Sequence, residues 1–314
     1  MRIHDKQINS GNNDADDLLW QHLKTVPAFR ALLRSIEARF YQYLDLPEPI
    51  LDLGCGDGHF SRLTFDHPLL AGIDPWWGPI NKAKESGAYM YVIQSLGDQL
   101  PFPNNYFGSV ISNSVLEHIP DVQSVLLDGC RVLRPGGKLV VTMPSQYFTE
   151  YLGGALWFEK MGLKGLADAY RRLFNRIARH AHTDSPERWA RRLARAGFEI
   201  EQWQYYFSKK ALHALELGHI QGLPSALIHF LTGHWILAPW QSNLKYTERW
   251  VRPNYEENFP ELGTMIIFVA QKVEETPTQA KLPNKKILSF SRLAGRNNAL
   301  PIAPPKSFSS KAPS

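Results

Sequence analysis

The chain has 314 residues, of which 44% are hydrophobic and 21% charged, and this balance excludes a wholly disordered or fibrous protein. Two cysteines are too few for a disulfide framework, and no apolar run follows Met1, so we expect a cytoplasmic protein without a secretory signal. The net charge of +5 resides near the C-terminus, because residues 272–314 hold eight Lys or Arg and two Glu, while the preceding 271 residues carry −1. The charge therefore indicates little about the folded part, and we predict a disordered basic tail over 273–314.

The N-terminal residues 1–46 are predicted to form helices. Between residues 14 and 44, apolar side chains recur near the 3.6-residue period of a helix. They are Leu18, Leu19, Leu23, Phe29, Leu32, Leu33, Ile36 and Phe40. Pro27 is expected to divide two helices, because proline lacks the N–H that a helix interior requires.

Residues 47–272 are predicted to form an α/β domain. Short apolar runs bounded by turn residues indicate strands at 50–53, 69–74, 89–93, 109–112, 138–143, 198–207 and 264–271. Helical segments separate them, among them 122–133, which Asp121 caps, and 185–196. Continuous apolar runs indicate strands buried on both faces, as in parallel sheets. We therefore predict a doubly wound, mainly parallel, seven-stranded Rossmann-like sheet with helical insertions at about 145–184 and 208–263.

The first predicted strand runs directly into a glycine-rich loop, in which Gly54, Gly56 and Gly58 alternate with other residues. Glycines have no Cβ and tolerate positive φ, so a ligand can lie against the main chain at the carboxyl end of this strand. Asp74 ends the second strand, where a carboxylate can accept hydrogen bonds from both hydroxyls of a ribose. Together these features indicate a nucleoside cofactor at the point where the strand order of the sheet reverses.

The spacing of the glycines distinguishes between two such cofactors. The dinucleotide motif has its third small residue five positions after the first, whereas here Gly58 follows Gly54 by four and His59 stands at the fifth position. Asp52, within the strand, would repel a pyrophosphate and attract the ammonium group of a methionine moiety. This favours S-adenosylmethionine over NAD, and a dinucleotide-dependent oxidoreductase is the weaker alternative.

Five stretches of sequence resemble the class I S-adenosylmethionine-dependent methyltransferases, most closely the type 11 group that includes ubiquinone and menaquinone biosynthesis enzymes. They are Leu51-Asp-Leu-Gly-Cys-Gly-Asp-Gly58, Gly72-Ile-Asp74, Leu100-Pro-Phe-Pro103, Leu116-Glu-His-Ile119 and Arg131-Val-Leu-Arg-Pro-Gly-Gly-Lys138. The resemblance covers roughly 49–145 and resumes at 194–200 and in the last strand.

This resemblance implies a methyltransferase and assigns its cofactor-binding residues. The methionine part would lie against Asp52 and the glycine loop, and the ribose against Asp74. Pro75, Trp76 and the backbone around Leu96 and Gly97 would surround the adenine, and Asn113 and Ser114 would line the cofactor. Relatives often have an acid at position 96 and Phe-Asp at Phe107-Gly108. These departures leave a non-catalytic cofactor-binding protein as a further alternative.

His118 is the candidate for a catalytic base, because its motif position is near the transferred methyl group. In-line transfer from a sulfonium needs alignment more than a metal, although an oxygen or nitrogen acceptor also needs a base. The alternative is that Glu117 and His118 only shape the loop. His180, His182 and Asp184 lie close in sequence, but a solvated helix end is the more ordinary interpretation, so we expect no metal site.

The two insertions are predicted to select the acceptor. Within 151–180, an arginine-rich helix with an apolar stripe fits either an anionic membrane surface or a cap over the site. Residues 217–240 contain no Asp, Glu, Lys or Arg, and we expect Gly218, Gly222, Pro224, Gly233 and Pro239 to interrupt any long helix there.

One crossing of a bilayer by 217–240 would place strands of one sheet on opposite sides, so we expect this segment to cover an apolar pocket, dip into one leaflet or pack on a partner. These features predict a small apolar or lipid-linked acceptor, met by a protein that is peripheral on the inner face of a membrane through 151–180 and 217–240. No nucleic acid partner is expected, because no aromatic stacking platform accompanies the basic residues. The sequence leaves the oligomeric state open.

Overall fold

The computed structural model describes residues 17–273, which are built around a seven-stranded sheet. The strand order is β3-β2-β1-β4-β5-β7-β6, and all neighbours are parallel except those of β7, which is antiparallel to β5 and β6. The strands are β1 (Ile50–Leu53), β2 (Leu69–Asp74), β3 (Tyr89–Gln94), β4 (Phe107–Asn113), β5 (Leu133–Pro144), β6 (Phe198–Tyr206) and β7 (Met265–Lys272). The predicted mainly parallel sheet is confirmed. The tail predicted over 273–314 lies, apart from Val273, outside the described residues.

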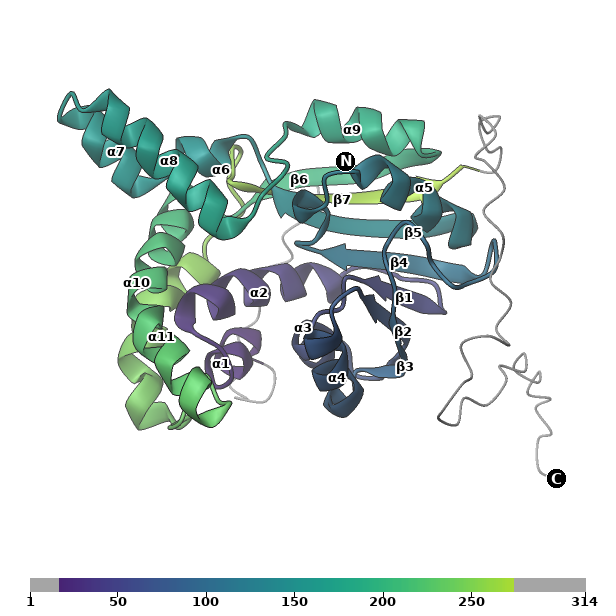
Figure 1. Ribbon diagram of the computed structural model, residues 1–314, viewed down its shortest axis with the longest axis horizontal. Coiled ribbons are helices and arrows are strands. Elements are labelled where there is room, and N and C mark those ends of the chain that lie inside the picture. The colour runs from purple at the N-terminus through teal and green to yellow at the C-terminus, as the bar shows by residue number, and fades with distance from the viewer. Residues whose placement is uncertain (1–16, 274–314) are drawn as a thin grey trace. The chain divides into compact units, whose positions relative to one another are not determined.

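Helices cover both faces of the sheet (Figure 1). One face packs against α5 (Val122–Val132) and α9 (Pro186–Arg195), and the other against α2 (Ala28–Tyr41) and α4 (Trp77–Ser86). Successive residues of a strand point to opposite faces, so Ile50 joins the core under α2 while Leu51 joins the core under α5. The two cores explain why most strands are apolar throughout.

Strand β3 is an exception to the prediction that the strands are buried on both faces. It pairs only with β2 and forms an edge of the sheet. Met90 is 67% exposed and Tyr91 47% exposed. The apolar run predicted the strand correctly and its burial wrongly, because sequence periodicity does not show which strand lacks a second neighbour. Strand β5 also begins at Leu133 rather than at residue 138, since Leu133 pairs with Phe107.

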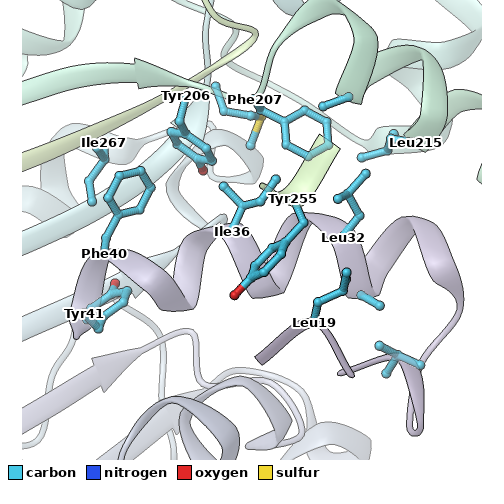
Figure 2. Packing of buried hydrophobic residues seen from close by; sticks show 14 of the residues in the cluster. Leu19, Leu32, Ile36, Phe40, Tyr41, Tyr206, Phe207, Leu215, Tyr255 and Ile267 are labelled. Carbon is cyan, nitrogen blue, oxygen red and sulfur yellow. The ribbon is translucent and has the colours of Figure 1, made fainter. Parts of the chain in front are cut away.

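The N-terminal helices are α1 (Leu18–Leu23) and α2, and Pro27 separates them as predicted by forming the N-cap of α2. Helix α2 packs its apolar face into the hydrophobic core (Figure 2). Leu32, Ile36 and Phe40 are buried there together with Tyr206 and Ile267. Burial of one such side chain contributes about 1.5–3 kcal/mol, so α2 is an integral part of the fold.

The first insertion contains α6 (Tyr147–Glu150), α7 (Gly153–Lys160) and α8 (Lys164–Ala178), and the second contains α10 (Lys209–Thr232) and α11 (Gln241–Tyr255). Of the helices within 17–273, none combines the length and apolar content needed to span a bilayer.

Helix α10 contradicts the prediction that its glycines and proline interrupt a long helix. It continues through Gly218, Gly222 and Pro224 and ends only at Gly233, whose φ is +76°. A Cβ at Gly218 would lie 2.7 Å from Cβ of Phe29, and one at Gly222 would lie 2.9 Å from the Phe29 ring. The two glycines therefore allow α10 to approach α2 closely, a contact between distant segments that the sequence does not reveal.

Candidate functional site

The residues predicted to bind the cofactor meet at the carboxyl edge of the sheet. Strand β1 lies between β2 and β4, so the order reverses at this point and the ends of the three strands are adjacent. The glycine loop follows β1, Asp74 ends β2, and Asn113 ends β4. In parallel sheets this is the position at which nucleotide-like ligands bind.

The glycine loop holds its shape through backbone bonds and leaves open space at one residue. Gly54 has φ +84° and donates its N–H to the carbonyl of Ile73 (2.9 Å), and a Cβ there would lie 2.5 Å from the methyl groups of Val115. Gly56 has φ +56°, and no described atom lies within 4 Å of the position its Cβ would take. Gly54 is therefore required by the fold, whereas Gly56 leaves room for a ligand against the main chain.

The helix behind the loop, α3 (His59–Thr64), begins with a hydrogen bond to the protein itself. The N–H of His59 donates to the carboxylate of Asp57 (3.2 Å), directly after Gly58. At least one N–H of this helix start is thus already used, as are the N–H groups of Gly54, Cys55, Gly56 and Gly58 in the loop itself.

Asp74 links the end of β2 to the glycine loop. One of its oxygens accepts a hydrogen bond from the Gly56 N–H (3.2 Å) and the other from the Trp76 N–H (2.9 Å). A carboxylate has about four acceptor positions, so Asp74 retains two for the hydroxyls of a ribose. Burial raises the pKa of this carboxyl above the usual aspartate value.

Asp52 lies in the interior between α3 and β3. It is 4% exposed, and one of its oxygens accepts hydrogen bonds from the hydroxyls of Ser61 and Tyr89, both at 2.6 Å. Burial raises the pKa of this carboxyl, against the effect of these two hydrogen bonds. The structure gives Asp52 a supporting role beneath the loop, and its contact with the ammonium group stays a prediction.

The residues predicted to surround adenine flank the same edge. Trp76 is 71% exposed at the start of α4, and the carbonyl of Pro75 accepts from the Gln94 side chain (2.9 Å). Leu96 is exposed, and a Cβ at Gly97 would lie 3.0 Å from a methyl group of Val125.

Gly108, which replaces the aspartate common in relatives, has a structural explanation. A Cβ at this position would lie 2.4 Å from the carbonyl oxygen of Pro47 and 2.6 Å from that of Glu48. Pro47 and Glu48 thus lie too close to position 108 for any residue with a Cβ, so glycine is required there. Its presence is therefore no evidence that catalysis has been lost.

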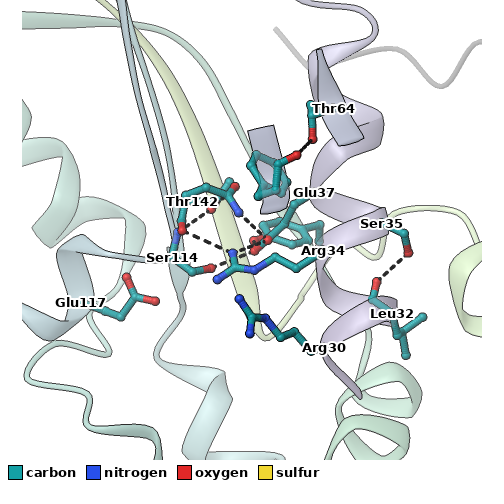
Figure 3. Close-up of polar contacts among 12 residues, drawn as sticks. Arg30, Leu32, Arg34, Ser35, Glu37, Thr64, Ser114, Glu117 and Thr142 are labelled. Atoms are coloured by element: carbon teal, nitrogen blue, oxygen red, sulfur yellow. Dashed lines mark hydrogen bonds and ion pairs between the residues drawn. The ribbon is translucent and has the colours of Figure 1, made fainter. Parts of the chain in front are cut away.

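A buried carboxylate that the sequence analysis missed organises the end of β4. Glu37 on α2 is fully buried and accepts hydrogen bonds from Asn113 Nδ2 (2.6 Å), Ser114 Oγ (2.9 Å), Tyr206 OH (2.8 Å) and Arg34 (2.8 Å), as Figure 3 shows in part. The side chains of Asn113 and Ser114 thus bind Glu37, so their predicted role in lining the cofactor would fall mainly to their backbone.

Two arginines on α2 bring positive charge to this edge. Arg34 is paired with Glu37 and also donates to the carbonyl of Asn113 (3.3 Å), while Arg30 lies 3.7 Å from Asp57 of the glycine loop. Their spacing of four residues places both on one face of the helix. This spacing was readable in the sequence, but nothing there indicated which strand they approach.

His118 belongs to a second polar cluster, beside the first. It lies with Glu117 in a short 3-10 helix, Leu116–His118, and potential ligand atoms of Glu117, His118 and His180 all lie within 4.8 Å of one another. Burial raises the pKa of Glu117 to about 8 and lowers the pKa of His180 to about 4. The pKa of His118 is also lowered, mainly by burial.

The interpretation of His180, His182 and Asp184 as a solvated helix end is wrong. Asp184 is buried and pairs with Arg188 (2.7 Å) and Arg192 (2.8 Å). His182 contacts the carbonyl of Ile119 through Nε2 (3.0 Å). Of these three side chains, only that of His180 joins Glu117 and His118, because the chain folds back onto the loop after β4.

A family model and curated relatives match the part of the sequence that holds this site. A family model described as "Methyltransferase domain" matches residues 51–141. The chain is 32% identical over 188 residues to the ubiquinone/menaquinone biosynthesis C-methyltransferase UbiE of Vibrio cholerae, covering 54% of this chain and 70% of that protein. The protein of the same name from Vibrio campbellii is 31% identical, with 54% and 71% covered. A solved SAM-dependent methyltransferase from Archaeoglobus fulgidus superimposes with a TM-score of 0.49 at 15% identity, covering 77% of this chain and 94% of that one.

Proposed function

Because the chain belongs to the class I, type 11 family of S-adenosylmethionine-dependent methyltransferases, we propose that it methylates a small apolar or lipid-linked acceptor of quinone-like chemistry. Members of this family are enzymes that use S-adenosylmethionine. The family therefore favours this function over the two alternatives, a dinucleotide-dependent oxidoreductase and a non-catalytic cofactor-binding protein. The names of the relatives support a quinone-like acceptor. The structure contributes the arguments for where such an acceptor would bind.

The residues at the carboxyl edge fit S-adenosylmethionine. Gly56 leaves open space beside the main chain, Asp74 has acceptor positions for the ribose, and Arg30 and Arg34 supply positive charge for the cofactor's carboxylate. The bound cofactor supplies a methyl group on a positively charged sulfur. The protein's task is to hold the acceptor in line with that methyl group and to remove a proton where the acceptor carries one, for which His118 is the candidate.

A cavity of about 290 Å³ lies between the α1–α2 turn and the α10–α11 segment; most of its lining residues are apolar, with Ser225, Asn243 and Thr247 among them, and it is the observation that carries the proposed acceptor class. Its lining includes Leu23, Val26, Pro27, Ile228, Trp235, Ile236, Leu237 and Leu244. Thr25, in the same turn, contacts His59 next to the glycine loop (2.6 Å). We propose that 17–46 and the two insertions form an acceptor-binding cap on a methyltransferase domain spanning 47–272.

Exposed apolar residues on the same cap support delivery of the acceptor from a membrane surface. Helices α7 and α8 lie side by side (Figure 1). They and the turn between them expose Trp157, Met161, Leu163, Leu166, Leu173 and Ile177. Lys160, Lys164, Arg172 and Arg176 lie among these side chains in the sequence and are exposed too. Apolar residues beside cations are typical of segments that bind anionic lipid surfaces.

A cavity-filling variant tests the acceptor class. Ala238 lines the cavity, so Ala238→Trp should reduce transfer of labelled methyl groups to the lipid fraction of a cell extract at least tenfold. Ala226, which is exposed on α10 outside the lining, provides the control variant Ala226→Trp. S-adenosylhomocysteine affinity should be unchanged in both. Transfer to the aqueous fraction alone, or equal activity of the two variants, would contradict the proposal.

A flotation assay tests the membrane contact separately. The chain should float with vesicles containing anionic lipid and less with purely zwitterionic vesicles. The double variant Leu173→Ser and Ile177→Ser should stay at the bottom of the gradient, whereas Leu127→Ser, at an exposed leucine of α5, should float normally. If all three proteins behave alike, α7 and α8 do not dock on the membrane.

A further inference from the structure

Glu117, His118 and His180 converge beside the cofactor edge with unused ligand atoms. Glu117 is 1% exposed, and within 17–273 neither its Oε2 nor the Nδ1 of His180 has a hydrogen-bond partner, although both atoms are buried. A buried polar atom without a partner costs about 1–3 kcal/mol. Two such atoms in one cluster indicate that a ligand belongs between them.

The protein's own backbone holds these side chains together. The N–H groups of Ala181 and His182 donate to the carbonyl of Glu117 at 2.7 and 3.0 Å, which fixes the segment after α8 against the 3-10 helix. The His118 Nδ1 lies 3.1 Å from the carbonyl of Arg179. Since a carbonyl only accepts, Nδ1 carries the proton and Nε2 keeps its lone pair, 3.7 Å from Glu117 Oε1. A histidine anchored to a carbonyl in this way is typical of metal ligands.

We propose that Glu117, His118 and His180 bind one divalent transition-metal ion. Zinc is the ion with which the experiment below tests the site. Two imidazoles and one carboxylate form a donor set that suits zinc and leaves a fourth position open. Tetrahedral zinc holds its ligand atoms about 3.4 Å apart, whereas the present separations reach up to 4.8 Å, so zinc binding would draw these side chains closer together. The nearby cation Arg34 is paired with Glu37 at 2.8 Å, which reduces its repulsion of a bound metal ion.

The open position gives the ion a role in the reaction, and this step rests on the proposed function. An acceptor hydroxyl bound there would lose its proton to solvent water more readily, because a metal ion lowers the pKa of oxygen acids that bind to it. His118 coordinating through Nε2 would not also act as a base. The cluster would then replace the single base predicted from the sequence.

Zinc titration by calorimetry tests the site on the full, untagged chain, treated with chelator and free of cofactor. We expect one zinc ion per chain and at least a tenfold loss of affinity in Glu117→Gln and in His180→Ala. His182→Gln is the matched control, because His182 contacts a carbonyl that glutamine also reaches, and its affinity should stay within twofold. Absence of zinc binding to the folded chain, or equal affinity in all variants, would overturn the proposal.

A cobalt spectrum locates the ion independently of affinity. His118→Cys loaded with Co²⁺ should show a thiolate-to-cobalt charge-transfer band, and His182→Cys should show none; a band in both or in neither would place the ion elsewhere. A separate titration of the metal-free chain with S-adenosylhomocysteine reports on the cofactor site. Failure of that titration would count against the proposed function and leave the zinc result standing.

Discussion

The substitution Glu37→Gln tests whether the buried carboxylate of α2 holds the end of β4 in place. Oε1 accepts from Ser114 and Tyr206, and Oε2 accepts from Arg34 and Asn113. Glutamine has one acceptor oxygen and one NH2 group. The amide oxygen can still accept from Arg34 and Asn113 while the NH2 group donates to the hydroxyl oxygens of Ser114 and Tyr206, but the buried negative charge that pairs with Arg34 is lost.

The size of the effect follows from these contacts. Hydrogen bonds to a charged group contribute about 1.5–3 kcal/mol each, and breaking a buried ion pair by removing one partner costs about 3–5 kcal/mol. We therefore expect the free energy of unfolding of Glu37→Gln to fall by about 3–5 kcal/mol, measured by urea denaturation followed by circular dichroism.

Two control variants separate this network from a general effect of removing a charge. Tyr206→Phe removes one of the four donors and should cost about 1–2 kcal/mol. Glu85→Gln changes an exposed glutamate on α4 and should stay within about 0.5 kcal/mol of the unmodified chain. A Glu37→Gln protein as stable as Glu85→Gln would refute the reasoning.

Three further predictions concern the loop and its surroundings. Gly56→Ala should weaken S-adenosylhomocysteine binding, measured by calorimetry, at least tenfold. Gly87→Ala is its control and should leave the affinity unchanged, because Gly87 has φ +70° and equally open surroundings, so that alanine there costs a similar free energy of backbone strain. Gly108→Ala should lower the melting temperature strongly or abolish soluble expression, because its Cβ would overlap the carbonyl of Pro47. Affinity for S-adenosylhomocysteine should fall as pH drops through the raised pKa of Asp74, since only the carboxylate accepts both ribose hydroxyls, and Asp74→Asn should remove this pH dependence.

Local patterns in the sequence predicted the sheet and the glycine loop, because these depend on neighbouring residues. Gly54, Gly56 and Asp74 lie where the motif spacing indicated, next to one another at the edge of the sheet. The course of α10 was not predictable in this way. Gly222 was interpreted as a helix breaker, whereas its actual role depends on Phe29, which lies almost 200 residues earlier in the chain.

The charged residues of the site could not be predicted either, because their contacts also join residues that are distant in the sequence. Glu37 resembles any charged residue on an amphipathic helix until the fold brings it to Asn113, 76 residues away. His180 reaches Glu117 from near the far end of the first insertion, where the sequence indicated only a solvated helix end.

Helix α2 connects the cofactor edge to the proposed acceptor cavity. One side of the helix supplies Arg30, which faces the glycine loop, and Glu37, which holds the end of β4. Ala28, at its first turn, lines the cavity, and Phe29 packs against the glycines of α10. A displacement of α2 would therefore alter the cofactor edge and the cavity together. In the proposed function, changes that reshape the cap for another acceptor must preserve the position of α2. That position depends on the close contact between α10 and α2, which requires glycine at residues 218 and 222.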